Sequence, residues 1–226
     1  MKITAISDLH GYLPKLPGGD LLILAGDYTS SDKVKQWAEF FAWLKKQKYT
    51  KKILVAGNHD HLLEKGFPKH QKEADDLKEV QEFLEINEDF EYLCDSSTEY
   101  NGLKIWGSPH SLWFQGINPK CTAFSTDETT LKKHYNKIPC DIDILVTHTP
   151  PWGMLDRNLN NESCGSLSLR NHTLCRERFT NLKLHVFGHI HEEGGKMFET
   201  TFCKFVNASI MNEFYIPKNK IITLEL

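Results

Sequence analysis

Five short apolar runs in this chain end directly in aspartate, asparagine or histidine, and this repetition constrains the fold more than any other feature. The segments that follow the runs are Ser7-Asp8-Leu9-His10, Gly26-Asp27, Gly57-Asn58-His59-Asp60, Thr147-His148 and Gly188-His189-Ile190-His191. Short apolar runs next to glycine are typical of buried strands. Because ligands bind at the carboxyl ends of the strands in open α/β sheets, these side chains are predicted to meet at one edge.

Strands and helices are expected to alternate along the chain. Strands are predicted at residues 2–7, 21–25, 53–56, 142–147, 184–187, 202–207 and 221–226. Helices are predicted at residues 34–44, 71–85 and 127–137, where apolar residues recur at helical spacing. This order predicts an α/β fold with a largely parallel or mixed sheet, organised as a single domain over residues 1–226.

Two polar segments between these elements carry weaker signals. The lysines of residues 45–52 are interpreted as the solvated C-terminal end of the first helix, where the helix dipole favours cations. Residues 158–173 are long and polar, and are interpreted as an irregular surface excursion or active-site loop.

The composition bounds the partners and the cellular location. The formal charge of -3 gives no broad attraction to nucleic acid or to an anionic membrane, so small molecules are the expected ligands. The apolar segment before Asp8 is too short for a signal peptide and no stretch reaches membrane-spanning length, which favours a cytoplasmic protein. The six cysteines lack a C-x-x-C pair, so we expect reduced, mostly buried thiols.

Taken in order, the D-x-H, G-D, G-N-H-D, T-H and G-H-x-H segments resemble the motif set of the calcineurin-like metallophosphoesterase superfamily. The resemblance covers nearly the whole chain and implies a four-layer α/β (α+β) fold, in which two mixed β-sheets pack as a sandwich flanked by helices. Residues 102–109, 149–156 and 207–209 are similar to the small metallophosphoesterase-domain-containing, class III phosphodiesterase-like proteins. His110 departs from that group, where an aromatic residue is expected, so the pocket is expected to differ there.

The resemblance also implies a site for two divalent metal ions. It assigns one ion to Asp8, His10, Asp27 and His191, and the second ion to Asp27, Asn58, His148 and His189. Asp27 is then expected to bridge the two ions. Manganese or iron suits these mixed nitrogen and oxygen donors, with zinc as an alternative. A hydroxide between the ions is the expected nucleophile for in-line attack on phosphorus.

His59 is interpreted as the catalytic residue that stabilises or protonates the leaving oxygen, because it lies beside Asn58 but outside the ligand set. Asp60 has two open interpretations, either orienting His59 or occupying a turn or helix N-cap. The aromatic residues near these motifs are interpreted as packing in preference to nucleobase stacking; they are Trp113, Phe114 and Trp152. His110 is kept as a candidate substrate contact, and the other histidines are interpreted as structural, at positions 61, 70, 134, 172 and 185.

The predicted function is hydrolysis of small phosphodiesters, with cyclic nucleotides among the candidates. Phosphomonoesterase, phosphoprotein phosphatase and nuclease activities are alternatives, because the loops around such a centre select the substrate. A protein-interaction scaffold without catalysis is a further alternative, which the intact His59 disfavours. The expected partner is a small phosphoester, a nucleotide being one candidate, with no membrane or nucleic-acid partner; the oligomeric state stays open.

Overall fold

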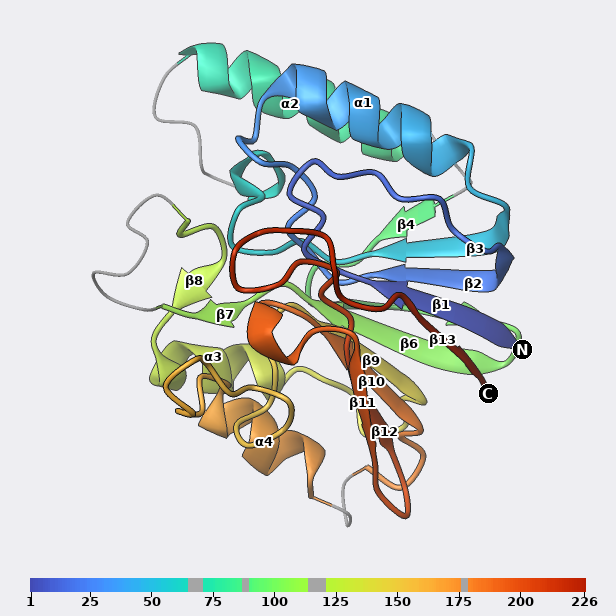
Figure 1. Ribbon diagram of the computed structural model, residues 1–226, viewed down its shortest axis with the longest axis vertical. Helices are drawn as coiled ribbons and strands as arrows, with labels where there is room; N and C mark the ends of the chain where they lie inside the picture. The colour runs from blue at the N-terminus through green and yellow to red at the C-terminus, as the bar shows by residue number, and fades with distance from the viewer. Residues whose placement is uncertain (65–70, 87–89, 114–120, 176–178) are drawn as a thin grey trace.

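The computed structural model describes residues 1–64, 71–86, 90–113, 121–175 and 179–226. Two mixed β-sheets pack face to face, and a pair of helices covers the outer face of each sheet (Figure 1). The layers therefore follow the order helices, sheet, sheet, helices. This arrangement confirms the mixed-sheet α/β fold that the motifs imply.

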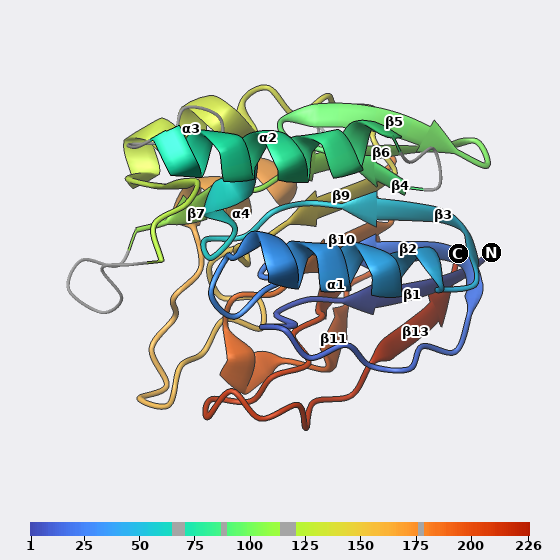
Figure 2. The same ribbon diagram turned by 90° about the horizontal axis from the view of Figure 1, so that it is seen from above.

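The first sheet has the order β13-β1-β2-β3-β4 and is parallel except for the edge strand β13. Its strands are β1 (Lys2–Ile6), β2 (Gly19–Leu24), β3 (Tyr49–Leu54), β4 (Phe90–Tyr92) and β13 (Ile222–Glu225). The helices α1 (Val34–Lys45) and α2 (Gln71–Ile86) lie side by side over this sheet (Figure 2). Helix α1 packs because its aromatic and leucine side chains occupy one face and are buried; they are Trp37, Phe40, Phe41 and Leu44.

The second sheet has the order β11-β12-β10-β9-β6-β5, with four parallel central strands and an antiparallel strand at each edge. Its strands are β5 (Ser96–Tyr100), β6 (Leu103–Ser108), β9 (Ile144–Thr147), β10 (Leu184–Phe187), β11 (Lys196–Glu199) and β12 (Lys204–Asn207). Helices α3 (Glu128–Tyr135) and α4 (Leu167–Thr173) cover its outer face. Two short strands, β7 (Ser111–Leu112) and β8 (Ser125–Thr126), form a separate parallel pair, and the single-turn 3₁₀ helices are His61–Leu63 and His191–Glu193.

The core between the sheets is aliphatic. Side chains from β1 and β2 such as Ile3 and Ile23 meet side chains from β9 and β10 such as Val146 and Val186, and all four are fully buried. Strands covered on both faces read as continuous apolar runs, which is why the sequence shows the central strands so clearly. The carboxyl ends of β1, β2, β3, β9 and β10 therefore lie at the same end of the sandwich (Figure 1).

Three interpretations from the sequence are corrected. Residues 158–173 are not irregular throughout, because α4 begins after Ser166, whose hydroxyl accepts a hydrogen bond from the Leu169 N–H. Only part of the lysine cluster lies at the C-terminal end of α1, because that helix ends at Lys45 whereas Lys51 and Lys52 belong to β3. The thiols are not mostly buried, because three are exposed and one, Cys203, is buried; none of the six is in a disulfide among the described residues. Within those residues, no helix combines the length and the apolar character needed to cross a membrane.

Candidate metal centre

All nine predicted site residues lie at the shared end of the two sheets. The first sheet contributes the residues after β1, β2 and β3, and the second sheet contributes those after β9 and β10. The residues from the first sheet are Asp8, His10, Asp27, Asn58, His59 and Asp60, and those from the second are His148, His189 and His191. The centre is therefore built across the sandwich, with contributions from each sheet.

One group of donor atoms is formed by Asp8, His10 and His191, whose ligand atoms lie within 4.8 Å of one another. The His191 Nε2 atom is 3.2 Å from Asp8 Oδ1 and 3.3 Å from His10 Nε2. Asp27 Oδ2 lies 3.8 Å from His10 Nε2 and borders this group. A carboxylate oxygen and two imidazole nitrogens at this spacing suit a first-row divalent cation.

A second group of donor atoms surrounds the other side of Asp27. His148 Nε2 is 3.4 Å from Asp27 Oδ2 and 2.9 Å from Asn58 Oδ1. Asp8, Asp27 and His148 together also place their donor atoms within 4.8 Å of one another. Among the described residues, His189 belongs to none of the groups of converging carboxylate and imidazole donor atoms. Its ring lies nearby, with a centroid 4.9 Å from that of His148. The structure thus brings six of the seven expected ligands into two adjoining groups, with His189 next to the second.

The backbone at this centre is strained in the way that functional sites often are. The φ angles of Asp8, His10, Asp27 and His189 are 54°, 41°, 58° and 70°, which places four of the expected ligands in the left-handed region. Residues other than glycine avoid this region because of steric crowding, and each such residue costs about 1–3 kcal/mol. The surrounding structure holds these residues there and so directs their side chains toward one point.

Two glycines leave the space that the donor side chains occupy. A Cβ atom on Gly57 would lie 2.2 Å from Asp27 Oδ1, and one on Gly188 would lie 2.2 Å from Asp8 Oδ2. Any side chain at either position would therefore push a carboxylate out of the centre. These two glycines are required by the close approach of donor and backbone.

The outer contacts of the histidines fix the ring orientation. His148 Nδ1 lies 2.7 Å from the Ala25 carbonyl oxygen, and His191 Nδ1 lies 3.2 Å from the Asn212 carbonyl oxygen. An Nδ1–H that donates to a carbonyl leaves the Nε2 lone pair available for a metal. Both rings then present Nε2 to the centre.

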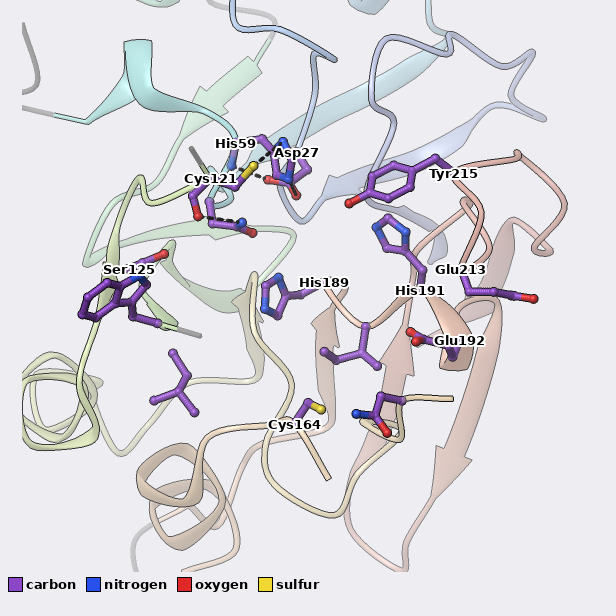
Figure 3. A pocket seen from close by; sticks show the side chains of 15 residues that line it. Asp27, His59, Cys121, Ser125, Cys164, His189, His191, Glu192, Glu213 and Tyr215 are labelled. Carbon is purple, nitrogen blue, oxygen red and sulfur yellow. Dashed lines mark hydrogen bonds and ion pairs between the residues drawn. The ribbon is translucent and has the colours of Figure 1, made fainter. Parts of the chain in front are cut away.

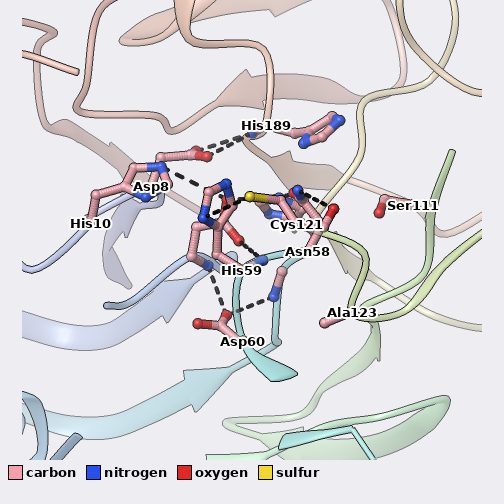
Figure 4. Close-up of polar contacts among 12 residues, drawn as sticks. Asp8, His10, Asn58, His59, Asp60, Ser111, Cys121, Ala123 and His189 are labelled. Carbon is pink, nitrogen blue, oxygen red and sulfur yellow. Dashed lines mark hydrogen bonds and ion pairs between the residues drawn. The ribbon is translucent and has the colours of Figure 1, made fainter. Parts of the chain in front are cut away.

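Asp60 contacts the backbone of the ligand loops in the structure. Its fully buried carboxylate accepts hydrogen bonds from the N–H groups of Asp27 and Gly57 at 2.8 Å each (Figure 4), and from the Tyr28 N–H at 3.0 Å. These contacts tie the loop after β2 to the loop after β3. They support a role for Asp60 in holding the loops, in place of direct contact with the His59 ring.

His59 lies at the edge of the centre with its side chain 18% exposed. Its backbone N–H donates to Asp27 Oδ1 at 2.9 Å, and its Nε2 atom is 3.9 Å from Asp27 Oδ2. The Nδ1 atom faces the Cys121 sulfur at 3.4 Å (Figure 4). Cys121 was not expected at the site, because it lies in a loop whose sequence carries no periodic signal.

The buried charges shift one another's pKa values. Burial raises the pKa of Asp8 and of Asp27, but the neighbouring imidazoles outweigh burial and leave both pKa values below their usual range. Burial lowers the pKa of His148, yet the two carboxylates outweigh it and raise the value to about 9. For His10 and His189 burial dominates, and it lowers their pKa values to about 4 and about 3. Two imidazoles are thus held neutral, the form that binds metals.

A cavity of about 330 Å³ opens beside the centre. The second sheet contributes His189 and His191 to its wall, opposite Asp27 and His59 from the first sheet (Figure 3). The remainder of the wall is mostly apolar or acidic and includes Leu112, Trp113, Cys121, Ile190, Glu192, Glu213 and Tyr215. Trp113 is half exposed and therefore lies outside the buried core, and its interpretation as packing stays a prediction. Phe114 lies outside the described residues.

Comparison with known proteins decides the family. The family described as "Calcineurin-like phosphoesterase" matches residues 1–193. The chain belongs to this family. Its members use divalent metals to hydrolyse phosphoesters, and the two donor groups of this calcineurin-like phosphoesterase fit such ions in number, type and spacing of ligand atoms.

Two relatives resemble this calcineurin-like phosphoesterase over most of their length. The UPF0046 protein C25E10.12 of Caenorhabditis elegans is 35% identical, and the match covers 93% of this chain and 75% of that protein. The human metallophosphoesterase domain-containing protein 1 is 33% identical, with 100% of this chain and 71% of that protein covered. These similarities confirm the resemblance to the small metallophosphoesterase-domain-containing group.

The fold matches solved structures at low identity. The TT1561 protein of Thermus thermophilus aligns with a TM-score of 0.64 and 17% identity, covering 91% of this chain and 88% of that one. The phosphopantetheinyl hydrolase PptH of Mycobacterium tuberculosis aligns with a TM-score of 0.58 and 17% identity, covering 98% and 95%. At these identities the likeness supports the fold alone.

Proposed function

We propose that this phosphoesterase is a phosphodiesterase with a dinuclear metal centre. Asp8, His10 and His191 would hold one ion, Asn58, His148 and His189 would hold the other, and Asp27 would contribute to both. The observation that carries the proposal is the position of Asp27 Oδ2, which lies 3.8 Å from His10 Nε2 and 3.4 Å from His148 Nε2, between the two donor groups.

Manganese or iron suits the mixed donors, with zinc as an alternative. When bound, two such ions would supply Lewis acidity toward the phosphoryl oxygens and would lower the pKa of a bound water. The single-domain organisation over residues 1–226 is part of the same proposal.

His59 is proposed to give a proton to the leaving oxygen. Its ring borders the cavity and is partly exposed, so a substrate oxygen can reach it. The backbone N–H of His59 is bonded to Asp27, the Cys121 sulfur contacts Nδ1 of the ring, and Nε2 is the nitrogen that lies toward the centre. Proton transfer by a positioned side chain contributes about 10²–10⁴-fold to the rate.

A small phosphodiester fits the cavity better than a polymer does. The volume of about 330 Å³ is at the lower end of the range for small-molecule pockets. The lining among the described residues holds two glutamates and no lysine or arginine, which gives a long polyanion no electrostatic footprint. The exposed ring of Trp113 on the wall provides a face for a planar group, so nucleotides remain within the proposed class.

A substrate panel tests the proposal. Manganese-loaded protein is assayed with an aryl phosphodiester, an aryl phosphomonoester and a phosphopeptide, and we expect the highest kcat/KM for the diester. His59→Ala is expected to lower kcat by about 10²-fold or more with metal content unchanged. His172→Ala, on α4 away from the cavity, is the control.

The phosphatase and scaffold alternatives have their own outcomes in this panel. Preference for the monoester or the phosphopeptide would favour the phosphatase alternatives. Absence of turnover on all three substrates, with two ions bound, would favour the scaffold. Full activity in His59→Ala would remove His59 from the mechanism.

A further inference from the structure

Outside the candidate metal centre, three side chains from separate parts of the chain converge on one carboxylate oxygen. Asp95 precedes β5, His110 lies between β6 and β7, and His134 lies in α3. Asp95 Oδ2 is 2.6 Å from His134 Nδ1 and 3.4 Å from His110 Nε2. The three donor atoms lie within 4.8 Å of one another, close enough for one ion about 2 Å from each donor after small side-chain rotations.

The contacts around this cluster hold the donors in place. Asp95 Oδ1 accepts a hydrogen bond from Ser108 Oγ at 2.7 Å, which orients the carboxylate so that Oδ2 faces the rings. The His110 carbonyl oxygen accepts a hydrogen bond from the buried hydroxyl of Tyr135 at 3.0 Å. Asp95 itself has a φ of 47°, a left-handed conformation that the surrounding structure must enforce. Oriented donors with outer hydrogen bonds are the usual construction of a metal site.

The two imidazoles are arranged in a way that disfavours double protonation. Their rings stack with centroids 3.4 Å apart and an interplanar angle of 30°. Two imidazolium rings in this position would repel each other at short range. Burial, together with the neighbouring His110, lowers the pKa of His134 despite the Asp95 carboxylate. A neutral imidazole keeps a lone pair that can bind a metal.

We infer that Asp95, His110 and His134 form a third metal site, specific for a zinc-class transition-metal dication and separate from the dinuclear centre. Two imidazole nitrogens favour zinc, nickel or copper over magnesium or calcium, which prefer oxygen donors. The side chains of the three residues are 11%, 15% and 22% exposed, so an ion can enter from solvent and a water can complete four-coordination.

Lys137 competes with an ion for the same carboxylate. Its Nζ atom is 2.9 Å from Asp95 Oδ2, and its side chain is 53% exposed, so the ammonium can rotate into solvent when the ion binds. Removing this charge should therefore strengthen metal binding. If the cluster were only a network of ion pairs, Lys137 would be one of the partners that hold it together. Removing Lys137 would then loosen the cluster and would not strengthen metal binding.

The site lies where an ion would stiffen the cavity wall. His110 comes directly before β7, and Leu112 of β7 and the following Trp113 line the cavity. Helix α3, which carries His134, packs against β7. An ion shared by Asp95, His110 and His134 would join α3 and the start of β5 to this wall.

The test uses Zn²⁺ as the probe and counts bound equivalents. Full-length protein is saturated with Zn²⁺, desalted and analysed for metal per chain, and we expect one equivalent fewer in His134→Ala and in His110→Phe than in the natural chain. The difference of one equivalent holds whether or not the dinuclear centre retains both of its ions, so failure of that proposal is distinguishable. An equal zinc content in correctly folded His134→Ala would overturn the inference.

A second pair of variants decides the matter without removing a ligand. Lys137→Met is expected to lower the Kd for this zinc equivalent about tenfold in calorimetric titration, because a unit charge a few ångströms from a dication is removed. Lys133→Met, which replaces an exposed lysine on α3 four residues before Lys137, is the matched control and should leave the Kd unchanged. An unchanged Kd in Lys137→Met, or no such equivalent in it, would refute the third site.

Discussion

Replacing Gly188 by alanine is predicted to damage the metal centre through one methyl group. A Cβ at this position would lie 1.9 Å from Ser7 Oγ and 2.2 Å from Asp8 Oδ2, whereas real Cβ contacts essentially never fall below 3.0 Å. The Ser7 hydroxyl and the Asp8 carboxylate must therefore move by about an ångström. Both groups are buried, so neither can turn into solvent.

The cost has two parts. Overpacking of a close-packed interior costs about 1–3 kcal/mol. Displacement of Asp8 also weakens the hydrogen bond that the His189 N–H donates to Asp8 Oδ2 at 3.0 Å, and a bond of this kind contributes about 1 kcal/mol. We expect a loss of about 3 kcal/mol in the free energy of unfolding, which corresponds to a fall in Tm of about 10 °C for a chain of this length. Metal affinity should fall about 10–100-fold, as it does when groups that position a ligand are lost.

The assay compares Gly188→Ala with Gly102→Ala. Gly102 has a φ of +74° and open space around its missing Cβ, so alanine there bears a backbone cost of about 1 kcal/mol and no collision. Urea unfolding gives the free energy of each variant, and Mn²⁺ titration gives its affinity. If Gly188→Ala binds manganese normally and unfolds within about 0.5 kcal/mol of the natural chain, the packing argument is wrong.

Two further predictions concern the buried charges. Asp60→Asn should lower the free energy of unfolding by about 2 kcal/mol in urea titration, because the amide NH₂ replaces an acceptor that faces backbone N–H groups; unchanged stability would contradict this account of its contacts. The raised pKa of His148, about 9, means that a proton must leave before a metal binds, so Mn²⁺ affinity should rise by about tenfold per pH unit between pH 7 and 9. In chelator-treated protein, by contrast, the free energy of unfolding should fall as the pH rises. The stability that His148 contributes is complete below its ordinary pKa of 6.5 and is lost as the pH rises toward 9. A stability that rises over that interval would count against this assignment.

The sequence predicted most of the candidate centre because its ligands follow buried parallel strands. Such strands appear as short continuous apolar runs, and residues directly after them must lie at one edge of the sheet. Asp8, Asp27 and His148 were identified in this way. Cys121 and Asn212 were missed because they approach the centre from loops that are far away in the sequence and show no period.

The parts of the fold that were missed have weak or mixed patterns. Strand β5 (Ser96–Tyr100) alternates between half-buried and exposed positions, so it has no apolar run to mark it. Strand β3 begins with Tyr49 and soon includes two lysines, one of them the buried Lys52, which reads as a helix end in the sequence. Helix α4 did carry a signal, since Ser166 is an N-cap residue before Leu169, but the helix was too short to stand out.

The division of the candidate centre between the two sheets has a consequence for synthesis of the protein on the ribosome. The first expected ligand is residue 8 and the last is residue 191, so about 180 residues must be translated before the ligand set is complete. At about 5–20 residues per second this takes some 10 to 40 s, and strands β1 to β4 of the first sheet have been synthesised well before then. Metal capture therefore comes after β1 to β4 have been synthesised, and a truncated chain that lacks the second sheet would carry its aspartates without the imidazoles that complete the centre.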